Sequence, residues 1–495
     1  MKKHLTLLLA LALTINFTAC TTIESIPVSP TEAETELTDI TYTEFSEMTV
    51  AVSDILPEET TESETTSATE SETTTEETTT TEETTTTTPA TTTTVTTTTP
   101  TTTTVTTTTP ATTTTPATTT TKATTTKPVV INPSSYTAIN YKEQIGMWIS
   151  FLEFQNILKG KSESQFRSSV QTMYDNCVNL GINTVYVHAR SHGDAFYESD
   201  IYPWSKNITG TIDGTPSFDP YEILIEEAHK RGLSFHAWIN PMRTLTTDDM
   251  SKISSDYKIK QWATSKNGTY IVNVGGTYWL SPAYSDVRKL IVDGAKEIVS
   301  KYKVDGVHID DYFYQSSFGK NFDSAAFASS GYSDRSQFRL DMVSQMVKEL
   351  YSGVKSVNST VLFGISPAGN IDNLYSTQFA DVKKWCSQSG YCDYIIPQVY
   401  WGFTHSSAAY DDVLDRWRSI HTNSDVKLIA GLAAYRAGTG EMANEPNVLA
   451  KQVQYFRTKS DYGGVAFFRY ESLFAPSSSV RTAINNEVAA LKKEL

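Results

Sequence analysis

Two adjacent carboxylates, Asp310 and Asp311, end a short apolar segment and precede the aromatic run Tyr312-Phe-Tyr314. Side chains of an extended strand alternate between two faces, so the aliphatic residues at 307 and 309 share one face and Asp310 takes the other. A buried carboxylate without a partner is costly, and structure alone seldom retains one. Paired carboxyl groups can act as acid, base or nucleophile. Asp310 is therefore the first candidate catalytic residue.

Polar and aromatic side chains also end the neighbouring predicted strands. The same alternation turns them toward the interior, where parallel strands of a barrel bring their carboxyl ends together. The alternative is structural, with Asp310 held by Arg190 or His308. The candidate binding residues from this reasoning are Arg190, Trp238, Asn240, His308, Tyr312, Gln398, Tyr400 and Trp401.

Carboxylates beside Trp and Tyr rings at one barrel mouth favour a sugar substrate. Glycoside hydrolysis uses two carboxyl groups that flank the scissile bond, and aromatic faces stack on pyranose rings. Asp310 is expected to act as nucleophile or as electrostatic stabiliser of an oxocarbenium-like transition state. Three carboxylates compete as proton donor: Asp311 is favoured, then Glu153 after the first strand, with Glu471 after the last strand as the third.

Beyond residue 138, short apolar runs alternate with amphipathic stretches of helical period, which is typical of repeated βα units. Eight such units predict a (β/α)8 barrel over residues 138–495, rather than a doubly wound sheet with its phosphate-binding glycine fingerprint. The predicted strands are Ile145–Phe151, Thr184–Ala189, Ser234–Ile239, Gly306–Asp310, Leu362–Ser366, Tyr394–Tyr400, Lys427–Ala433 and Gly464–Arg469. The predicted helices are Glu163–Leu180, Pro220–Arg231, Ser285–Tyr302, Ser336–Val357, Ser376–Ser389, Tyr410–Ile420, Asn447–Lys459 and Val480–Leu495.

A long insertion follows the third strand, from Arg243 to about Pro282. Apolar runs around Gly275-Gly276 predict a β-hairpin, which a barrel would place over the active-site mouth. Cys177 lies in a predicted amphipathic helix and is expected to be buried like a hydrophobic residue. Cys386 and Cys392 flank a short loop that an exported protein could close with a disulfide.

The first 135 residues differ in composition from the rest. Residues 1–20 have the charged, apolar and small-residue order of a secretory signal, and Cys20 after Thr18-Ala19 resembles the lipidation site of a bacterial lipoprotein. Residues 21–135 are rich in Thr, Glu and Pro and predict a disordered linker. That linker holds 18 acidic residues against Lys122 and Lys127, which matches the net charge of −16 of the whole chain. The acidic balance therefore says nothing of what the barrel binds, and no basic patch suggests nucleic acid.

The barrel resembles the glycosyl hydrolase-like 10 family. The run Asp305-Gly-Val-His-Ile-Asp-Asp-Tyr-Phe-Tyr314 is similar to the family's fourth-strand motif. Five further motifs match in order: Gly146-Met-Trp-Ile-Ser150, Arg190 with Gly193-Asp194-Ala195, Trp238-Ile-Asn-Pro241, Trp279-Leu-Ser-Pro282 with Val287-Arg288, and Pro397-Gln-Val-Tyr-Trp401. The resemblance implies a barrel hydrolase of cell-envelope or extracellular polysaccharide, with some relatives acting on peptidoglycan glycan strands. It adds Asp194 to the binding candidates.

Two alternatives stay open at this point. A metal-dependent hydrolase or deacetylase would use His236, His308 and Asp310 as ligands, although the first strand lacks the His pair usual in barrel metallohydrolases. A non-catalytic glycan-binding surface protein would keep the barrel without turnover. The favoured interpretation expects no metal or cofactor, a polysaccharide partner, no nucleic acid, and membrane association only through a lipid on Cys20, at the outer face of the cell membrane.

Overall fold

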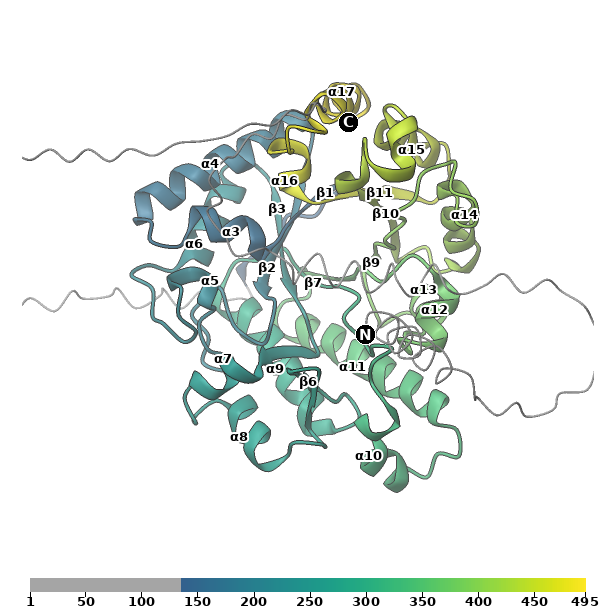
Figure 1. The fold of residues 1–495 in the computed structure, drawn as a ribbon. Coiled ribbons are helices and arrows are strands. Elements are labelled where there is room, and N and C mark those ends of the chain that lie inside the picture. Colours follow the sequence, from purple (N-terminus) through teal and green to yellow (C-terminus); the bar gives the residue numbers. More distant parts are fainter. Residues whose placement is uncertain (1–134) are drawn as a thin grey trace, which may run out of the picture. The chain divides into compact units, whose positions relative to one another are not determined.

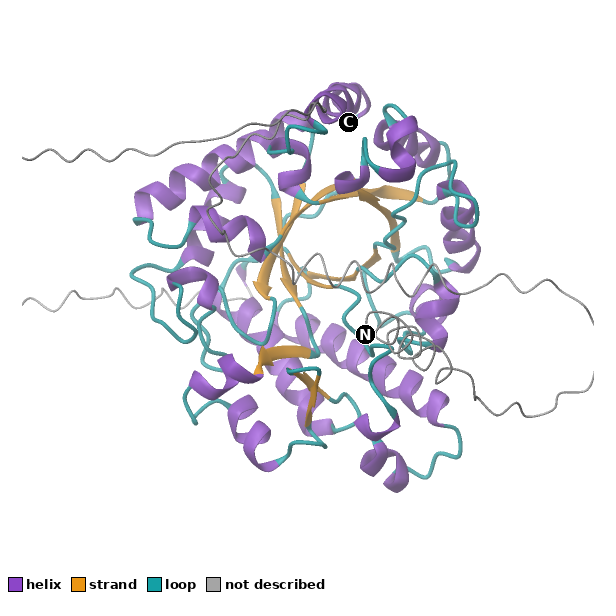
Figure 2. Cartoon of the chain, in the orientation of Figure 1, coloured by secondary structure: helices purple, strands orange, loops and turns teal. Residues whose placement is uncertain are grey.

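The computed structural model describes residues 135–495. The signal at 1–20, the lipid site at Cys20 and the linker up to residue 134 lie outside these residues. The described chain forms a closed barrel of eight parallel strands in the order β1-β11-β10-β9-β8-β7-β3-β2, drawn as the orange ring in Figure 2. The predicted (β/α)8 barrel is therefore confirmed.

The barrel strands follow the apolar runs of the sequence closely. Their bounds are β1 Gln144–Ile149, β2 Thr184–Arg190, β3 Ser234–Ile239, β7 Gly306–Ile309, β8 Leu362–Ile365, β9 Tyr394–Ile395, β10 Lys427–Ala433 and β11 Tyr462–Phe468. The prediction for the sixth barrel strand was too long. Regular pairing there ends at Ile395, and beyond it only Gln398 makes isolated bridges, to Ala368 and Gly431.

Helices surround the ring in Figure 1. The long ones are α4 Glu163–Leu180, α6 Pro220–His229, α9 Ser285–Lys301, α11 Arg335–Val357, α14 Tyr410–Ile420, α15 Val448–Arg457 and α17 Arg481–Glu494. The shorter helices are α3 Phe151–Ile157, α5 Lys206–Thr209, α7 Thr247–Lys252, α8 Lys258–Ser265, α10 Ser324–Ser329, α12 Ile371–Ser376, α13 Val382–Ser387 and α16 Tyr470–Phe474. The predicted helix 376–389 is wrong in its bounds, because the chain forms two separate short helices, α12 and α13, in that region.

The predicted hairpin is present. Strands β5 Ile271–Val274 and β6 Thr277–Leu280 pair antiparallel, and β4 Arg243–Thr246 completes a small sheet against β6. Gly275 and Gly276 have φ of 61° and 86°, a left-handed conformation that a two-residue hairpin turn requires. The Trp279 ring of β6 stacks near the Tyr312 ring, with centroids 6.3 Å apart, so the small sheet borders the end of β7.

The segment before β1 closes the amino-terminal end of the barrel. The fully buried Asp305 accepts hydrogen bonds from Tyr136 Oη at 2.5 Å, from Ile139 N at 2.6 Å and from Phe235 N at 2.7 Å, and its Oδ2 lies 2.8 Å from His229 Nε2. Asp305 directly precedes β7. The chain therefore enters the barrel at the ends of the strands opposite to Asp310.

The three cysteines of the described residues are free thiols. Cys177 is fully buried on α4, as expected of a hydrophobic residue. Cys386 and Cys392 are buried and not joined, so the disulfide considered for them is absent here. No helix within 135–495 has both the length and the apolar character needed to cross a membrane.

Candidate functional site

Asp310 follows the last residue of β7 and lies at the carboxyl end of the barrel, with 3% of its surface exposed. Trp238 Nε1, from β3, donates to Asp310 Oδ2 at 2.9 Å, and Tyr312 N contacts Oδ1 at 3.4 Å. Asp311 is half-buried next to it. Neither carboxylate forms an ion pair within 4 Å. The structural alternative, in which Arg190 or His308 holds Asp310, is therefore wrong.

Burial raises the pKa of both carboxyl groups. For Asp310 the pKa lies well above its usual range because of burial and then the charge of Asp311, against the opposing influence of Arg243 and Trp238. For Asp311 burial raises the pKa to about 6, while a hydrogen bond from Gln398 and the charge of Arg243 oppose the rise. Coupled carboxyl groups of this kind titrate as a pair. The pair therefore retains a proton at pH values where ordinary aspartates are ionised.

Arg243, at the start of β4, is the cation whose positive charge lowers the pKa of both carboxyl groups. Its guanidinium lies 3.8 Å from the centroid of the Tyr312 ring, and its Nε and Nη2 each lie 3.3 Å from Ser191 O. Arg243 is 4% exposed and has no carboxylate within ion-pair distance. Sequence reasoning used Arg243 only as the start of the insertion and missed its place in the site.

Aromatic rings form a second side of the site. The buried Tyr400 ring packs at 6.0 Å from both Tyr435 and Phe468. Burial raises the pKa of Tyr400, and the charges of Asp311 and Asp310 raise it further. Gln398, on the same side, donates a hydrogen bond from its Nε2 to Ser366 O at 3.2 Å. The structure thus brings Tyr400 and Gln398 together with the carboxylates. Tyr435 and Phe468 are additions that no sequence motif had indicated.

His188, on β2, is a further residue that sequence reasoning passed over, although its interior parity was evident. Its ring stacks on Trp238 with centroids 3.4 Å apart, and its Nδ1 accepts from Phe151 N at 3.1 Å. Burial and the charge of Arg243 hold the pKa of His188 well below its usual value, so the ring is neutral at neutral pH. His188 therefore lies beside the residue that contacts Asp310.

The expectation that Arg190 faces the barrel axis is wrong. The pairing of β2 with β3 shifts by one residue between His188 and Arg190, and such a bulge reverses the alternation. Arg190 instead lies over the Tyr202 ring at 4.2 Å and reaches Gly294 of α9. Arg190 therefore lies between the barrel and its helices, away from the carboxylate pair.

His308 faces the interior as predicted, and His236 also faces it, one layer deeper in the barrel. His308 Nε2 accepts from Trp148 Nε1 at 3.2 Å, and both histidines contact Tyr394 Oη through Nδ1. The ring of Trp238 packs in the same core cluster. These contacts involve both ring nitrogens of His308, and within 135–495 no three His, Cys, Asp or Glu side chains converge as a metal site would need. The geometry therefore gives no support to His236, His308 and Asp310 as a ligand set.

The remaining candidates have other partners. Glu153 closes the capping box of α3 with Ser150 and forms an ion pair with Arg469, whose other nitrogen binds the half-exposed Glu471 at 2.7 Å. Asp194 is buried and accepts from His192 N at 2.9 Å within its own loop. Trp401 is 5% exposed and its backbone oxygen accepts from Gln452. Of the proposed proton donors, only Asp311 adjoins Asp310.

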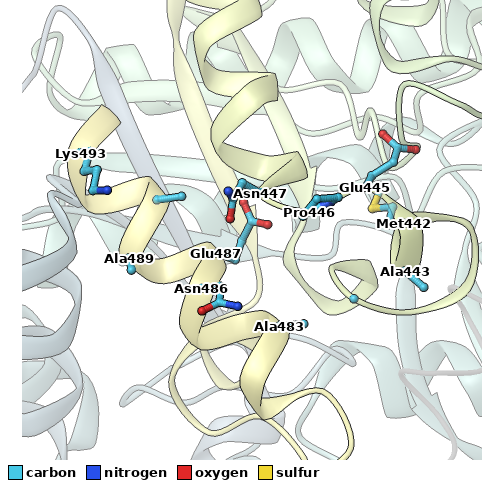
Figure 3. Close-up of a pocket in the computed structure, with 12 residues that line it drawn as sticks. Met442, Ala443, Glu445, Pro446, Asn447, Ala483, Asn486, Glu487, Ala489 and Lys493 are labelled. Atoms are coloured by element: carbon cyan, nitrogen blue, oxygen red, sulfur yellow. The ribbon is translucent and has the colours of Figure 1, made fainter.

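A separate hollow of about 410 Å³ lies elsewhere, between the turn at Gly440–Asn444 and α17 (Figure 3). Glu445 and Glu487 line it, but their carboxylates serve the fold: Glu445 accepts from Phe403 N and Thr404 N, and Glu487 accepts from Ala450 N at the start of α15. No member of the carboxylate pair or its neighbours lines this hollow. We therefore assign the chemistry to the barrel mouth.

Replacing Asp311 by Asn is expected to stabilise the fold more at pH 8 than at pH 4. The pKa of Asp311 is raised from 3.8 to about 6, so the wild type loses stability as the pH rises between those values and does not regain it above them. Two units correspond to about 3 kcal/mol at full burial, and for this half-buried, coupled group we expect about 1–2 kcal/mol. Thermal unfolding at both pH values measures the difference, with the exposed Asp425→Asn as control. An equal stability change at pH 4 and pH 8 would contradict it.

The chain is similar to several known proteins. The chain is 35% identical over 303 residues to the glycosyl hydrolase YngK of Bacillus subtilis, covering 56% of this chain and 58% of YngK. It is 29% identical over 389 residues to the glycosyl hydrolase DigH of Escherichia coli K12, covering 71% of this chain and 88% of DigH. The chain thus spans less than two thirds of YngK. Among solved structures, the PgaB (BpsB) glycoside hydrolase domain of Bordetella bronchiseptica aligns with a TM-score of 0.49 at 12% identity, over 69% of this chain and 99% of that domain.

The family model extends over the part of the chain that forms the barrel and its mouth. The match covers residues 144–449, from β1 into α15, and includes Trp238, Arg243 and both carboxylates. It ends before β11 and therefore leaves out Phe468. On this match, the chain belongs to the glycosyl hydrolase-like 10 family.

Proposed function

We propose that this protein hydrolyses O-glycosidic bonds of a cell-envelope or extracellular polysaccharide, with peptidoglycan glycan strands as the first candidate substrate. The observation that carries the proposal is the Asp310–Asp311 pair, which lies at the carboxyl end of the barrel with a raised pKa on both groups. Aromatic rings beside the pair supply faces on which sugar rings can stack. Membership of a glycosyl hydrolase-like family supports the same reaction.

The pair can supply both functions that glycoside hydrolysis needs. Its retained proton would be transferred to the glycosidic oxygen, while the ionised carboxylate would stabilise the positive charge that develops at the anomeric carbon. The alternatives Glu153 and Glu471 are both held in ion pairs with Arg469. The preference for Asp311 as the donor stays a prediction.

Product analysis tests the proposal. The full chain would be incubated with purified peptidoglycan, with denuded glycan strands and with other surface polysaccharides, and the soluble fraction examined by mass spectrometry. New reducing-end saccharides are expected from at least one polymer. If tight glycan binding is found with no product from any polymer, the protein is a glycan-binding surface protein instead. Loss of activity on addition of a chelator would revive the metal-dependent alternative.

The activity should rise with pH around pH 6. The reaction needs one protonated and one ionised carboxyl group, and the pair reaches that state when it loses the first of its two protons, at a pKa of about 6. Arg243→Gln removes a positive charge that lowers the pKa of both groups, so the rise should move up by about one pH unit. Arg243→Lys keeps the charge and should keep the midpoint. The pH dependence of kcat/KM measures this, and an unmoved midpoint in Arg243→Gln would count against the assignment.

We also propose export and attachment at the outer face of the cell membrane through a lipid on Cys20. The support is the order of residues 1–20, with a small-residue site directly before Cys20. Cys20→Ser should move the protein from the detergent-extracted membrane fraction to the soluble fraction, as followed by immunoblot. Retention of Cys20→Ser in the membrane fraction would argue against lipid attachment at this residue.

A further inference from the structure

Three buried side chains beside the carboxylate pair have polar atoms without hydrogen-bond partners: His188 Nε2, Asn240 Oδ1 and Arg243 Nη1. Each residue is at most 5% exposed. Buried polar groups are nearly always satisfied, so unpaired ones at a mouth indicate a group that binds there. Because the three residues lie in one region, their unpaired atoms can form hydrogen bonds to a single bound chemical group.

A shared acceptor and neighbouring contacts place the three residues together. Ser191 O accepts from Asn240 Nδ2 at 2.8 Å and from Arg243 Nε and Nη2 at 3.3 Å, so the amide and the guanidinium share one acceptor. Asn240 lies close enough to His188 to favour the protonated form of its ring, and neither His188 Nε2 nor Asn240 Oδ1 has a partner at hydrogen-bond geometry. Arg243 stacks on Tyr312, whose backbone N contacts Asp310 Oδ1. The cluster therefore adjoins the reacting carboxylates.

The hydrogen positions of this cluster follow from its contacts. His188 Nδ1 accepts from Phe151 N, so the neutral ring carries its hydrogen on Nε2, which is then a donor. Asn240 Nδ2 donates to Ser191 O, which fixes Oδ1 as an acceptor. Arg243 Nη1 is a donor. The three unpaired atoms are thus two donors and one acceptor. They are complementary to a neutral group that has an acceptor oxygen and a donor hydrogen.

We propose that His188, Asn240 and Arg243 form a subsite for the neutral substituent on C2 of the sugar whose glycosidic bond is cleaved. This rests on the proposed hydrolysis, because the carboxylates act at the anomeric carbon and C2 is the adjacent ring carbon. A hydroxyl group and an acetamido group both have the required acceptor oxygen and donor hydrogen. An ammonium group has no acceptor and is repelled by Arg243.

Three β-1,4-linked hexasaccharides that differ only at C2 test the subsite: those of N-acetylglucosamine, glucose and glucosamine. Their binding to the full chain is measured by titration calorimetry in an Asp311→Asn background, so that no probe is consumed. We expect one neutral hexamer to bind more tightly than the glucosamine hexamer by about 100-fold or more, because sites built to pair a polar group reject analogues that lack it. The preferred neutral hexamer identifies the substituent.

Arg243→Lys and Asn240→Asp should reduce that preference at least about tenfold, with little change for the glucosamine hexamer. The matched control is Arg288→Lys, which changes an arginine paired with Glu349 on the outer helices. Unfolding temperatures verify that the variants fold. Equal binding of all three hexamers, no binding of any, or an equal loss for all three in Arg243→Lys would overturn the subsite. None of these outcomes decides whether the wild type hydrolyses polysaccharide, which product analysis measures separately.

Discussion

Asp310→Asn is expected to release no detectable saccharide from a polysaccharide that the wild type degrades, a loss in kcat/KM of at least about 10³-fold. The substitution keeps the size of the side chain and the hydrogen bond from Trp238 Nε1, but it removes the carboxylate whose negative charge the transition state needs. It also removes the repulsion between two adjacent carboxylates, so the variant should fold at least as stably as the wild type. Mass spectrometry of the products and thermal unfolding measure the two effects together.

Glu471→Gln is the matched control for this loss. Glu471 is a half-exposed carboxylate that follows the last barrel strand and forms an ion pair with Arg469. We expect the variant to keep its activity within about threefold, as is usual for groups that take no part in proton transfer. Comparable losses in Glu471→Gln and Asp310→Asn would mean that the proton donor has been misassigned. Full activity of Asp310→Asn would remove the central carboxylate from the mechanism.

Asp305→Ala is expected to give the largest loss of stability, about 3–5 kcal/mol. The carboxylate is fully buried. It accepts hydrogen bonds from Tyr136, Ile139 and Phe235 and contacts the His229 ring. Its removal leaves several buried donors unpaired at once. Denaturant unfolding measures the loss, and Asp425→Ala, at an exposed position, is the control. A change below about 1 kcal/mol would show that these contacts contribute little.

The Asp305 and Asp310 predictions separate two carboxylates of one motif. Both lie in the run that carries the family resemblance, but the predicted strand begins after Asp305 and ends at Asp310. The structure confirms this difference in position, because Asp305 precedes β7 and Asp310 follows it. Active sites of such barrels lie at the carboxyl ends of the strands. Asp305→Ala should therefore impair folding while leaving kcat per folded molecule unchanged.

Periodicity was enough to predict most of the fold. The bounds of α4, α14, β3 and β10 match the apolar and amphipathic patterns residue for residue, because each element buries one regular face. The strand before Gln398 was overextended, since its apolar residues continue after regular pairing has ended at Ile395. Buried loops and strands have similar composition, and hydrogen bonding distinguishes them only in three dimensions.

The site was less predictable, because its residues come from irregular backbone. Alternation correctly placed Trp238 and Asp310, which lie on or next to regularly paired strands. It failed at Arg190, where a bulge in β2 shifts the pairing by one residue and no local sequence signal announces it. Arg243 follows a strand and turns back over Tyr312 through contacts of the small sheet. Such a position depends on the packing of distant segments and is not encoded in any local period.

The entry of the chain at Tyr136 has a mechanical consequence. Ile139 and Ala138 bind Asp305, Ser234 and Thr360, all at the amino ends of barrel strands, whereas the carboxylate pair lies at the opposite ends. A pulling force transmitted through residue 135 would act first on these contacts and on the strand ends around them. The load would spread into the β-ladder of the barrel before it reached the mouth. Distances among Trp238, Asp310 and Arg243 would thus change little under tension at residue 135.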